Sequence, residues 1–271
     1  MRLKIERVSG NLQGMLKALI LAGGLGTRLR EETEYKPKPM VEVGGRPILW
    51  HIMKNLSQQN ISNFVIASGY KGESIKDYFL NYHARNNDVT IDLGQQSQFT
   101  QHGSHNESDW TVTIANTGEL TMTGGRVHKA AKYLEGGRFL CTYGDGLADV
   151  NLSELIKFHE SHGKIATVTT VKPLSRFGIM DVNENGIVQQ FREKPVMDGW
   201  VNAGFFIFEP EIFEYLNEEC VLEAEPLARL ASNGQLAAYR HEGFWQPMDT
   251  LRESNFLNEL WNTNQAPWKN W

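Results

Sequence analysis

Apolar residues recur along the chain with two periods, one typical of buried strands and the other of amphipathic helices. Residues 16–22 (LKALILA) form a near-continuous apolar run, as expected for a strand covered on both faces of a parallel sheet. The segment 47–59 then places Ile48, Ile52 and Leu56 at helical spacing. This order of strand and helix repeats through the first 160 residues and predicts a mostly parallel sheet with helices on both faces.

The same two periods predict the remaining elements. Strands are predicted at residues 63–68, 88–93, 110–115, 138–143, 164–171, 178–182, 187–191 and 201–208. Helices are predicted at residues 72–84, 125–134, 152–162, 210–217, 223–232 and 249–261. The polar segment 94–109 has no period and predicts a loop, whereas 183–186 (NENG) is a hairpin turn signal between two strands.

These elements predict the fold class and the domain organisation. We expect an α/β fold, with a Rossmann-like, mostly parallel mixed sheet, helices on both faces and a small β-rich appendage formed by the later strands. Residues 15–271 are expected to form a single domain. Residues 1–14 lack the apolar region of a signal peptide and are expected to form a disordered or loosely docked arm. The Trp-rich tail that ends at Trp271 is expected to bury either on its own subunit or at a contact between subunits.

Composition excludes several classes of protein. The chain has 271 residues, 41% of them hydrophobic, and its net charge of -5 argues against bulk binding of nucleic acid. It has no run of 18 apolar residues, so no membrane span is expected. Cys141 and Cys220 have no Cys or His partner at metal-ligand spacing, which favours a reducing cytoplasm over a disulfide framework. His159 and His162 lack a third ligand for a metal and are expected to be surface or capping residues.

A glycine-rich loop follows the first predicted strand. Gly23, Gly24 and Gly26 let the backbone approach a ligand closely and expose N–H groups that suit phosphate oxygens. The loop is not a dinucleotide-binding G-x-G-x-x-G motif, because Leu29 stands at the place of the third glycine, and it lacks the Gly-Lys-Ser/Thr of a P-loop. Glycines alone are also typical of a tight strand-to-helix turn.

Two cations after the loop strengthen the prediction of a phosphate site. Arg28 carries a planar fork that can hold two phosphate oxygens. Lys38 lies in 36–40 (KPKPM), where prolines on both sides stiffen the backbone and aim its amine at one place. Lys36 is expected to be solvated.

The segment 23–48 resembles the signature of the sugar-1-phosphate nucleotidyltransferases. It contains GGLGTRL at 23–29, PKPM at 37–40 and VGGRPI at 43–48. Further motifs resemble those of the cytidylyl-transferring members of this family, and they are 121–126 (TMTGGR), 143–146 (YGDG), 176–178 (RFG), 193–195 (EKP), 202–206 (NAGFF) and 244–252 (FWQPMDTLR). The resemblance covers the chain from about Met15 to Trp271 and implies the nucleotide-diphospho-sugar transferase type of fold, with the appendage binding the sugar.

The resemblance implies an activity and its substrates. Such enzymes transfer a cytidylyl group from CTP to glucose 1-phosphate, or a close sugar 1-phosphate, giving CDP-glucose and pyrophosphate for deoxysugars of surface polysaccharides. It also implies Mg²⁺ as the cofactor and a homo-oligomer, either a hexamer or another multimer. No protein nucleophile is needed, because the sugar phosphate oxygen is already anionic and catalysis comes from positioning and charge neutralisation.

The resemblance also assigns roles to individual residues. The nucleotide is expected to bind Leu21, Ala22, Gly23, Gly24, Gly26, Thr27, Arg28, Lys38, Thr121, Arg126 and Gly144, of which Thr121 and Arg126 recognise the base and ribose. The sugar phosphate is expected to bind Glu193, Lys194 and Asn202, and Mg²⁺ to bind Asp145 and Asp249. The catalytic group is expected to comprise Arg28, Lys38, Asp145 and Lys194.

The residues support the metal assignment to different degrees. Asp145 comes at the carboxyl end of a predicted strand, where open α/β sheets bind their ligands, and Mg²⁺ prefers oxygen ligands. Asp249 precedes a predicted helix and has the role of helix N-cap as an alternative.

Departures from the family pattern leave alternatives open. Ala203 stands where the pattern has a glycine beside the sugar, and 172–175 (KPLS) differs from the usual lead-in, so a relative of glucose is an alternative substrate. A uridylyl- or thymidylyltransferase and a non-catalytic nucleotide sensor are alternative functions. The presence of Asp145, Lys194 and Asp249 favours an enzyme. The missing third glycine weakens a dinucleotide-dependent oxidoreductase.

Overall fold

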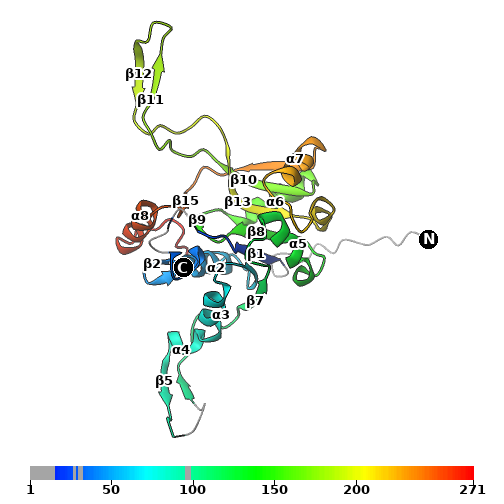
Figure 1. Ribbon diagram of the computed structural model, residues 1–271, viewed down its shortest axis with the longest axis vertical. Helices are drawn as coiled ribbons and strands as arrows, with labels where there is room; N and C mark the ends of the chain where they lie inside the picture. The colour runs from blue at the N-terminus through cyan, green and yellow to red at the C-terminus, as the bar shows by residue number, and fades with distance from the viewer. Residues whose placement is uncertain (1–15, 27–28, 30–32, 95–98) are drawn as a thin grey trace, which may run out of the picture.

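The protein is built around a mixed β-sheet (Figure 1). The computed structural model describes residues 16–26, 29, 33–94 and 99–271, and in these residues seven strands form one sheet in the order β14-β10-β13-β8-β1-β4-β7. The strands are β1 (Lys17–Ala22), β4 (Asn63–Ser68), β7 (Thr111–Asn116), β8 (Phe139–Tyr143), β10 (Ala166–Val171), β13 (Val201–Phe208) and β14 (Leu236–Arg240). β1 runs parallel to β4 and β8, β4 to β7 and β10 to β14, whereas β13 is antiparallel to β8 and β10. The predicted mostly parallel mixed sheet is therefore confirmed.

Helices cover both faces of the sheet because successive side chains of its strands point to opposite sides. On β1, Ala18 and Ile20 join one buried core, and Leu19 and Leu21 join the other. The first core is closed by α2 (Ile48–Ser57), α3 (Gly72–Leu80), α4 (Tyr82–Asn86), α6 (Leu152–His162) and α8 (Leu251–Asn262). The second is closed by α5 (Thr123–Leu134), the 3-10 helix η4 (Pro210–Tyr215) and α7 (Glu225–Ser232). Both predicted helical layers are present.

Short ladders and hairpins surround the sheet. They are β2 (Glu42–Val43) with β3 (Arg46–Pro47), β5 (Asp88–Ile91) with β6 (Phe99–His102), β9 (Gly146–Ala148) with β15 (Trp245–Pro247), and β11 (Ile179–Val182) with β12 (Val188–Arg192). A one-turn 3-10 helix, η3 (Lys38–Met40), precedes β2. The β5–β6 and β11–β12 hairpins project from the body in opposite directions, and β11–β12 is the predicted appendage (Figure 1).

Four predictions about local structure were wrong. His159, expected to be a surface or capping residue, is buried, and its Nδ1 lies 2.7 Å from Thr167 Oγ1. The predicted helix 72–84 is broken at Asn81 into α3 and α4, and the predicted loop 94–109 contains β6. β14 was not predicted, because 236–240 (LAAYR) has no clear period and forms a half-exposed edge strand. The predicted arm, residues 1–14, lies outside the described residues, as do the predicted site residues Thr27 and Arg28.

The Trp-rich tail packs on its own subunit, on α2. Trp268 is fully buried, and its carbonyl oxygen accepts a hydrogen bond from Asn55 Nδ2 at 2.7 Å. Its indole N–H donates to His51 Nδ1 at 3.4 Å, and His51 Nε2 lies 2.7 Å from the Val43 carbonyl oxygen. Burial lowers the pKa of His51 to about 4, so its ring is neutral at pH 7. Among the described helices, none has the length and apolar character needed to cross a bilayer.

Candidate active site

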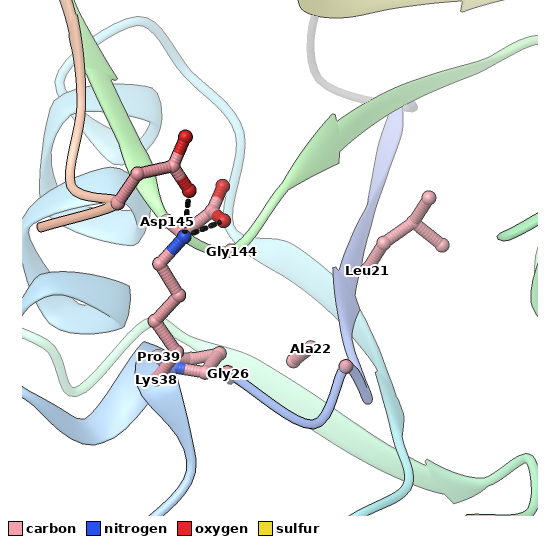
Figure 2. A pocket seen from close by; sticks show the side chains of 9 residues that line it. Leu21, Ala22, Gly26, Lys38, Pro39, Gly144 and Asp145 are labelled. Atoms are coloured by element: carbon pink, nitrogen blue, oxygen red, sulfur yellow. Dashed lines mark hydrogen bonds and ion pairs between the residues drawn. The ribbon is translucent and has the colours of Figure 1, made fainter. Parts of the chain in front are cut away.

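Three charged side chains from distant parts of the chain meet at the carboxyl end of β8, a central strand of the sheet. Lys38 Nζ lies 2.6 Å from Asp145 Oδ2 and 2.5 Å from Asp249 Oδ1 (Figure 2). The Lys38 side chain is 11% exposed, whereas Asp145 and Asp249 are 33% and 21% exposed. The ammonium group is thus enclosed between two carboxylates that solvent still reaches.

The β9–β15 ladder brings the two carboxylates together. Asp145 lies between β8 and β9, and Asp249 follows β15. Pro247 of β15 pairs with Gly146 of β9, and the Met248 N–H donates to the Asp145 carbonyl oxygen at 2.8 Å. Because these strands are only three residues long, their pairing has no clear pattern in the sequence.

Asp249 does not cap the helix that follows it. The N-cap of α8 is Thr250, whose side chain accepts a hydrogen bond from the Glu253 N–H, while the Glu253 side chain accepts from the Thr250 N–H. Glu253 Oε2 also accepts from the Asp249 N–H at 2.7 Å. The N-cap alternative for Asp249 was therefore wrong, and its carboxylate faces Lys38 instead.

The backbone around Lys38 presents its amine to the carboxylates. η3 begins at Lys38 after Pro37, and the next two residues, Pro39 and Met40, are buried and anchor the turn. Burial acts to lower the pKa of Lys38, but the charges and hydrogen bonds of the two carboxylates outweigh it and raise the pKa above its usual value. Lys38 is therefore a permanent cation in this setting.

A cavity of about 240 Å³ opens beside the Lys38 ammonium (Figure 2). It is lined by Leu21, Ala22, Gly24, Gly26, Lys38, Pro39, Gly144, Asp145 and Asp249, which include six of the predicted nucleotide residues. Gly144 is needed for close packing here, because a Cβ would lie 3.0 Å from the Leu21 carbonyl oxygen and 3.1 Å from Pro39 Cγ. The Gly144 N–H donates to that carbonyl at 2.9 Å and joins the ends of β1 and β8.

A second cavity, of about 230 Å³, shares the carboxylate pair with the first. It is lined by Thr142, Tyr143, Asp145, Gly146, Asn202, Ala203, Phe205, Trp245, Pro247 and Asp249. The predicted sugar residue Asn202 is among them. Tyr143 and Trp245 were missed by the sequence analysis, although both lie within recognised motifs, next to a glycine and a proline-containing turn respectively.

Arg126 is buried and bonded to the chain itself. Its guanidinium donates to the Gly23 carbonyl at 2.8 Å, to Thr117 Oγ1 at 2.7 Å and to the Gly118 carbonyl at 2.8 Å. A Cβ on Gly23 would lie 2.1 Å from Arg126 Nη1, so Gly23 makes room for the guanidinium. Arg126 thereby fastens the loop after β1 to the loop after β7, and burial lowers its pKa.

Other predicted contacts are not assembled at the cavities. Thr121 donates to the Thr117 carbonyl at 2.6 Å and accepts from Lys129. Glu193 and Lys194 follow β12, are exposed, and pair with each other at 3.4 Å without lining either cavity. Contacts of Thr121 with the base, and of Glu193 and Lys194 with the sugar phosphate, stay predictions.

The carboxylate pair has the chemistry of a Mg²⁺ site. Mg²⁺ takes oxygen ligands and is commonly held by one or two carboxylates together with substrate phosphates and water. Among the described residues, no group of three or more His, Cys, Asp or Glu side chains is placed to hold a metal ion. Asp145 and Asp249 fit a metal that completes its coordination with phosphate oxygens and water.

Comparison with known proteins agrees with this geometry. The family model described as nucleotidyl transferase matches residues 17–246. The chain belongs to the nucleotidyl transferase family. This nucleotidyl transferase is 49% identical over 259 residues to glucose-1-phosphate cytidylyltransferase from Salmonella typhi, covering 94% of this chain and 100% of the relative. It is 44% identical over 260 residues to the probable glucose-1-phosphate cytidylyltransferase from Bacillus subtilis (strain 168), with the same two coverages.

A solved structure supports the fold of the nucleotidyl transferase. HddC from Yersinia pseudotuberculosis, crystallised in a complex with GMP-PN, matches it with a TM-score of 0.65. The match covers 91% of this chain and 99% of HddC at 23% sequence identity. At that identity the likeness concerns the fold alone.

Proposed function

We propose that the chain transfers the cytidylyl group of CTP to glucose 1-phosphate, forming CDP-glucose and pyrophosphate. The observation that carries the proposal is the pair of cavities that meet at Asp145 and Asp249, since the reaction needs two phosphate groups at one point. The relatives named glucose-1-phosphate cytidylyltransferase, 44% and 49% identical over their full lengths, support CTP and glucose 1-phosphate as the two substrates.

The nucleotide occupies the first cavity and the sugar phosphate the second. The glycine loop and Lys38 bind the triphosphate, Thr121 contacts the base, Arg126 holds the loops around the nucleotide in place, and Asn202 binds sugar hydroxyls. An oxygen of the sugar phosphate attacks the α-phosphorus as the bond to the β-phosphate oxygen breaks. Pyrophosphate leaves with that electron pair, and no covalent intermediate forms on the protein.

Charge neutralisation is the main task of the site. Two unit charges about 4 Å apart repel by about 4 kcal/mol near a protein surface, and the two substrates carry several. Lys38 supplies one fixed cation, and we assign Arg28 to the pyrophosphate, Lys194 to the phosphate of the sugar substrate and Glu193 to the sugar hydroxyls. Mg²⁺ bound to Asp145 and Asp249 would neutralise charge on the α-phosphate and the sugar phosphate.

We propose that the protein is a homo-oligomer in which another subunit covers the β11–β12 hairpin. The hairpin exposes large apolar side chains, including Met180, Ile187 and Phe191, and projects from the body (Figure 1). An isolated two-stranded hairpin is at best marginally stable, and exposed apolar patches of this kind mark interfaces. Light scattering coupled to size exclusion should give a mass above that of one chain, and Phe191→Asp should lower it.

The product suggests where the enzyme acts. CDP-glucose is an activated sugar, and we propose that it enters the synthesis of deoxysugars for surface polysaccharides. We place the reaction in the cytoplasm, where nucleoside triphosphates such as CTP are made.

An assay of base specificity tests the proposal. The protein is incubated with Mg²⁺, glucose 1-phosphate and CTP, UTP or dTTP in turn, and pyrophosphate release is followed, with mass spectrometry of the product. CTP should be strongly preferred. Equal or greater activity with UTP or dTTP would contradict the cytidylyl assignment, and no activity with any nucleotide would favour a sensor that binds without turnover.

A further inference from the structure

A chain of side-chain hydrogen bonds runs from the second cavity to the start of α5. Asn202 Nδ2 donates to the Tyr143 hydroxyl at 3.1 Å, and that hydroxyl donates to one carboxylate oxygen of Glu223. The other carboxylate oxygen accepts from Thr123 Oγ1 at 2.6 Å. Thr123 is the first residue of α5 and lies two positions after Thr121. The wall of the proposed sugar cavity is thus tied to the segment proposed to recognise the nucleotide.

The groups in this chain fix the direction of each hydrogen bond. A carboxylate such as Glu223 only accepts. A tyrosine hydroxyl ordinarily keeps its proton at pH 7, so the Tyr143 O–H donates a hydrogen bond to the Glu223 carboxylate. The lone pairs of the hydroxyl then accept from Asn202 Nδ2, while Asn202 Oδ1 accepts from the Gly204 N–H at 2.8 Å. The Asn202 amide is therefore held in one of its two orientations.

Close packing keeps Glu223 in place. A Cβ on Gly124 would lie 2.4 Å from Cys220 Sγ, and a Cβ on Gly125 would lie 2.2 Å from the Glu218 carbonyl oxygen. The Gly125 N–H also donates to the Cys220 carbonyl at 3.1 Å. The two glycines let the loop that carries Glu223 approach α5 more closely than any larger residue would allow.

The backbone beside Asn202 is held in uncommon conformations. Gly204 has φ 78° and Phe205, a residue with a bulky side chain, has φ 50°. A Cβ on Gly204 would lie 2.9 Å from Tyr143 Cδ2. Such conformations persist where the surroundings enforce them, and they cluster at ligand sites. β13 therefore departs from regular strand geometry beside the cavity, where Tyr143 packs against Gly204.

We infer that Tyr143 and Glu223 are positioning residues that orient Asn202 for recognition of the sugar hydroxyls. This inference rests on the proposed function, in which the second cavity holds the sugar 1-phosphate. A site whose donor and acceptor are fixed in advance rejects a sugar with a misplaced hydroxyl, because its polar groups are then left unpaired. Without Glu223, the Tyr143 proton is no longer committed to a carboxylate, and one of the two contacts that hold the Asn202 amide is weakened, leaving the Gly204 N–H as the other.

The test compares Tyr143→Phe and Glu223→Ala with the wild-type protein. The KM for glucose 1-phosphate should rise about 3- to 10-fold, while the KM for CTP stays within about twofold, as expected for one lost hydrogen bond. The rates with galactose 1-phosphate and mannose 1-phosphate, relative to glucose 1-phosphate, should increase. Glu219→Gln, an exposed residue on the same loop, is the matched control and should change none of these values.

Two outcomes would overturn the inference. One is unchanged sugar KM and epimer preference in both variants. The other is a uniform fall in kcat together with changes in both KM values and a lower melting temperature, which indicates a merely structural role. Preference for another nucleoside triphosphate would contradict only the proposed function, since the sugar dependence is measured with whichever nucleotide reacts. If no nucleotide reacts, calorimetric titration with glucose 1-phosphate replaces the kinetics, and equal dissociation constants in all proteins overturn the inference.

Discussion

Two regions of the molecule carry the lysines assigned to phosphate groups, and they differ in their surroundings. Lys38 lies on η3, beside the carboxyl end of the central strand β8. Its side chain is largely buried and forms ion pairs with two carboxylates. Lys194 follows β12, the second strand of the projecting hairpin (Figure 1), and its exposed side chain pairs with that of the neighbouring Glu193. One cation is held by the folded body, and the other is presented on an extension.

This difference in surroundings suggests different roles for the two lysines. Charges held by the body need no reorganisation during the reaction, so they can stabilise developing charge efficiently. An exposed ion pair such as Lys194–Glu193 contributes about 0–1 kcal/mol to stability and leaves the ammonium available for another partner. In our proposal the preformed centre performs the chemistry, and the hairpin delivers the sugar phosphate contact when the subunits assemble.

The largest effect is expected from Asp145→Asn in the preformed centre. It removes one of the two negative charges that hold Lys38 and, in our proposal, the metal. We expect kcat to fall by about 100- to 1000-fold with an unchanged circular dichroism spectrum. Asp77→Asn makes the same substitution at an exposed residue of α3, away from both cavities, and should leave kcat unchanged. Near-normal turnover of Asp145→Asn would remove this carboxylate from the catalytic centre.

The second largest effect is expected from Lys194→Ala, which tests whether the hairpin contributes to the proposed sugar phosphate site. Lys194→Ala should lower kcat/KM for glucose 1-phosphate by about 10- to 100-fold, the usual cost of losing a hydrogen bond to a charged group. Binding of CTP, measured by calorimetry, should not change. Lys157→Ala, which removes an exposed lysine from α6, is the control. Normal sugar kinetics in Lys194→Ala would show that the preformed centre works without the hairpin lysine.

The sequence predicted the elements of the body well because their patterns are local. α6 was predicted with its observed bounds, since its apolar face is regular, Asn151 caps its start and Gly163 ends it at φ 62°. β14 was missed because an edge strand that is exposed on part of each face has little periodicity. Residue 81, where the predicted helix breaks into two, carries an asparagine rather than a proline or glycine signal.

The candidate site was predictable only in part. The composition of the glycine loop and the spacing to Lys38 were visible in the sequence, but the meeting of Asp145 with Asp249 depends on a ladder of three residues. The polar chain through Glu223 was missed because its members come from four separate segments. The burial of Arg126 was also missed, since neither spacing nor residue type distinguishes a guanidinium that binds backbone carbonyls from one that binds a base.

A smaller effect is expected on metal binding when Lys38 is replaced, because Lys38 and a metal ion would occupy the same place between the two carboxylates. Lys38→Met removes the ammonium that lies between the carboxylates and repels a cation there, so the nucleotide-free protein should bind Mn²⁺ about 10-fold more tightly. A factor of 10 corresponds to about 1.4 kcal/mol, which lies towards the solvated end of the range of about 1 to 4 kcal/mol for unit charges about 4 Å apart. Electron paramagnetic resonance measures the free Mn²⁺ directly. Lys36→Met, a change at a nearby lysine of the same loop, should leave the affinity unaltered. Weaker Mn²⁺ binding in Lys38→Met would show that the lysine does not compete with the metal.

The smallest effect on activity is expected from replacing His51, the residue of α2 that contacts Trp268 of the tail. The side chain of His51 can titrate, whereas hairpin residues 179–192 contain no histidine. Burial lowers the pKa of His51 from 6.5 to about 4, so between these pH values the unfolded chain binds a proton that the folded chain does not. The free energy of unfolding is therefore not reduced by His51 above pH 6.5, and it falls as the pH is lowered from 6.5 towards 4.

Urea denaturation at pH 7 and pH 4.5 measures this loss. The free energy of unfolding should fall by about 2 kcal/mol more in the wild-type protein than in His51→Gln, which keeps a polar side chain but cannot titrate. Activity at pH 7 should change little, because His51 touches neither cavity. If both proteins lose the same free energy, His51 is not held neutral by the tail, and the packing of Trp268 on α2 does not give the body its own pH dependence.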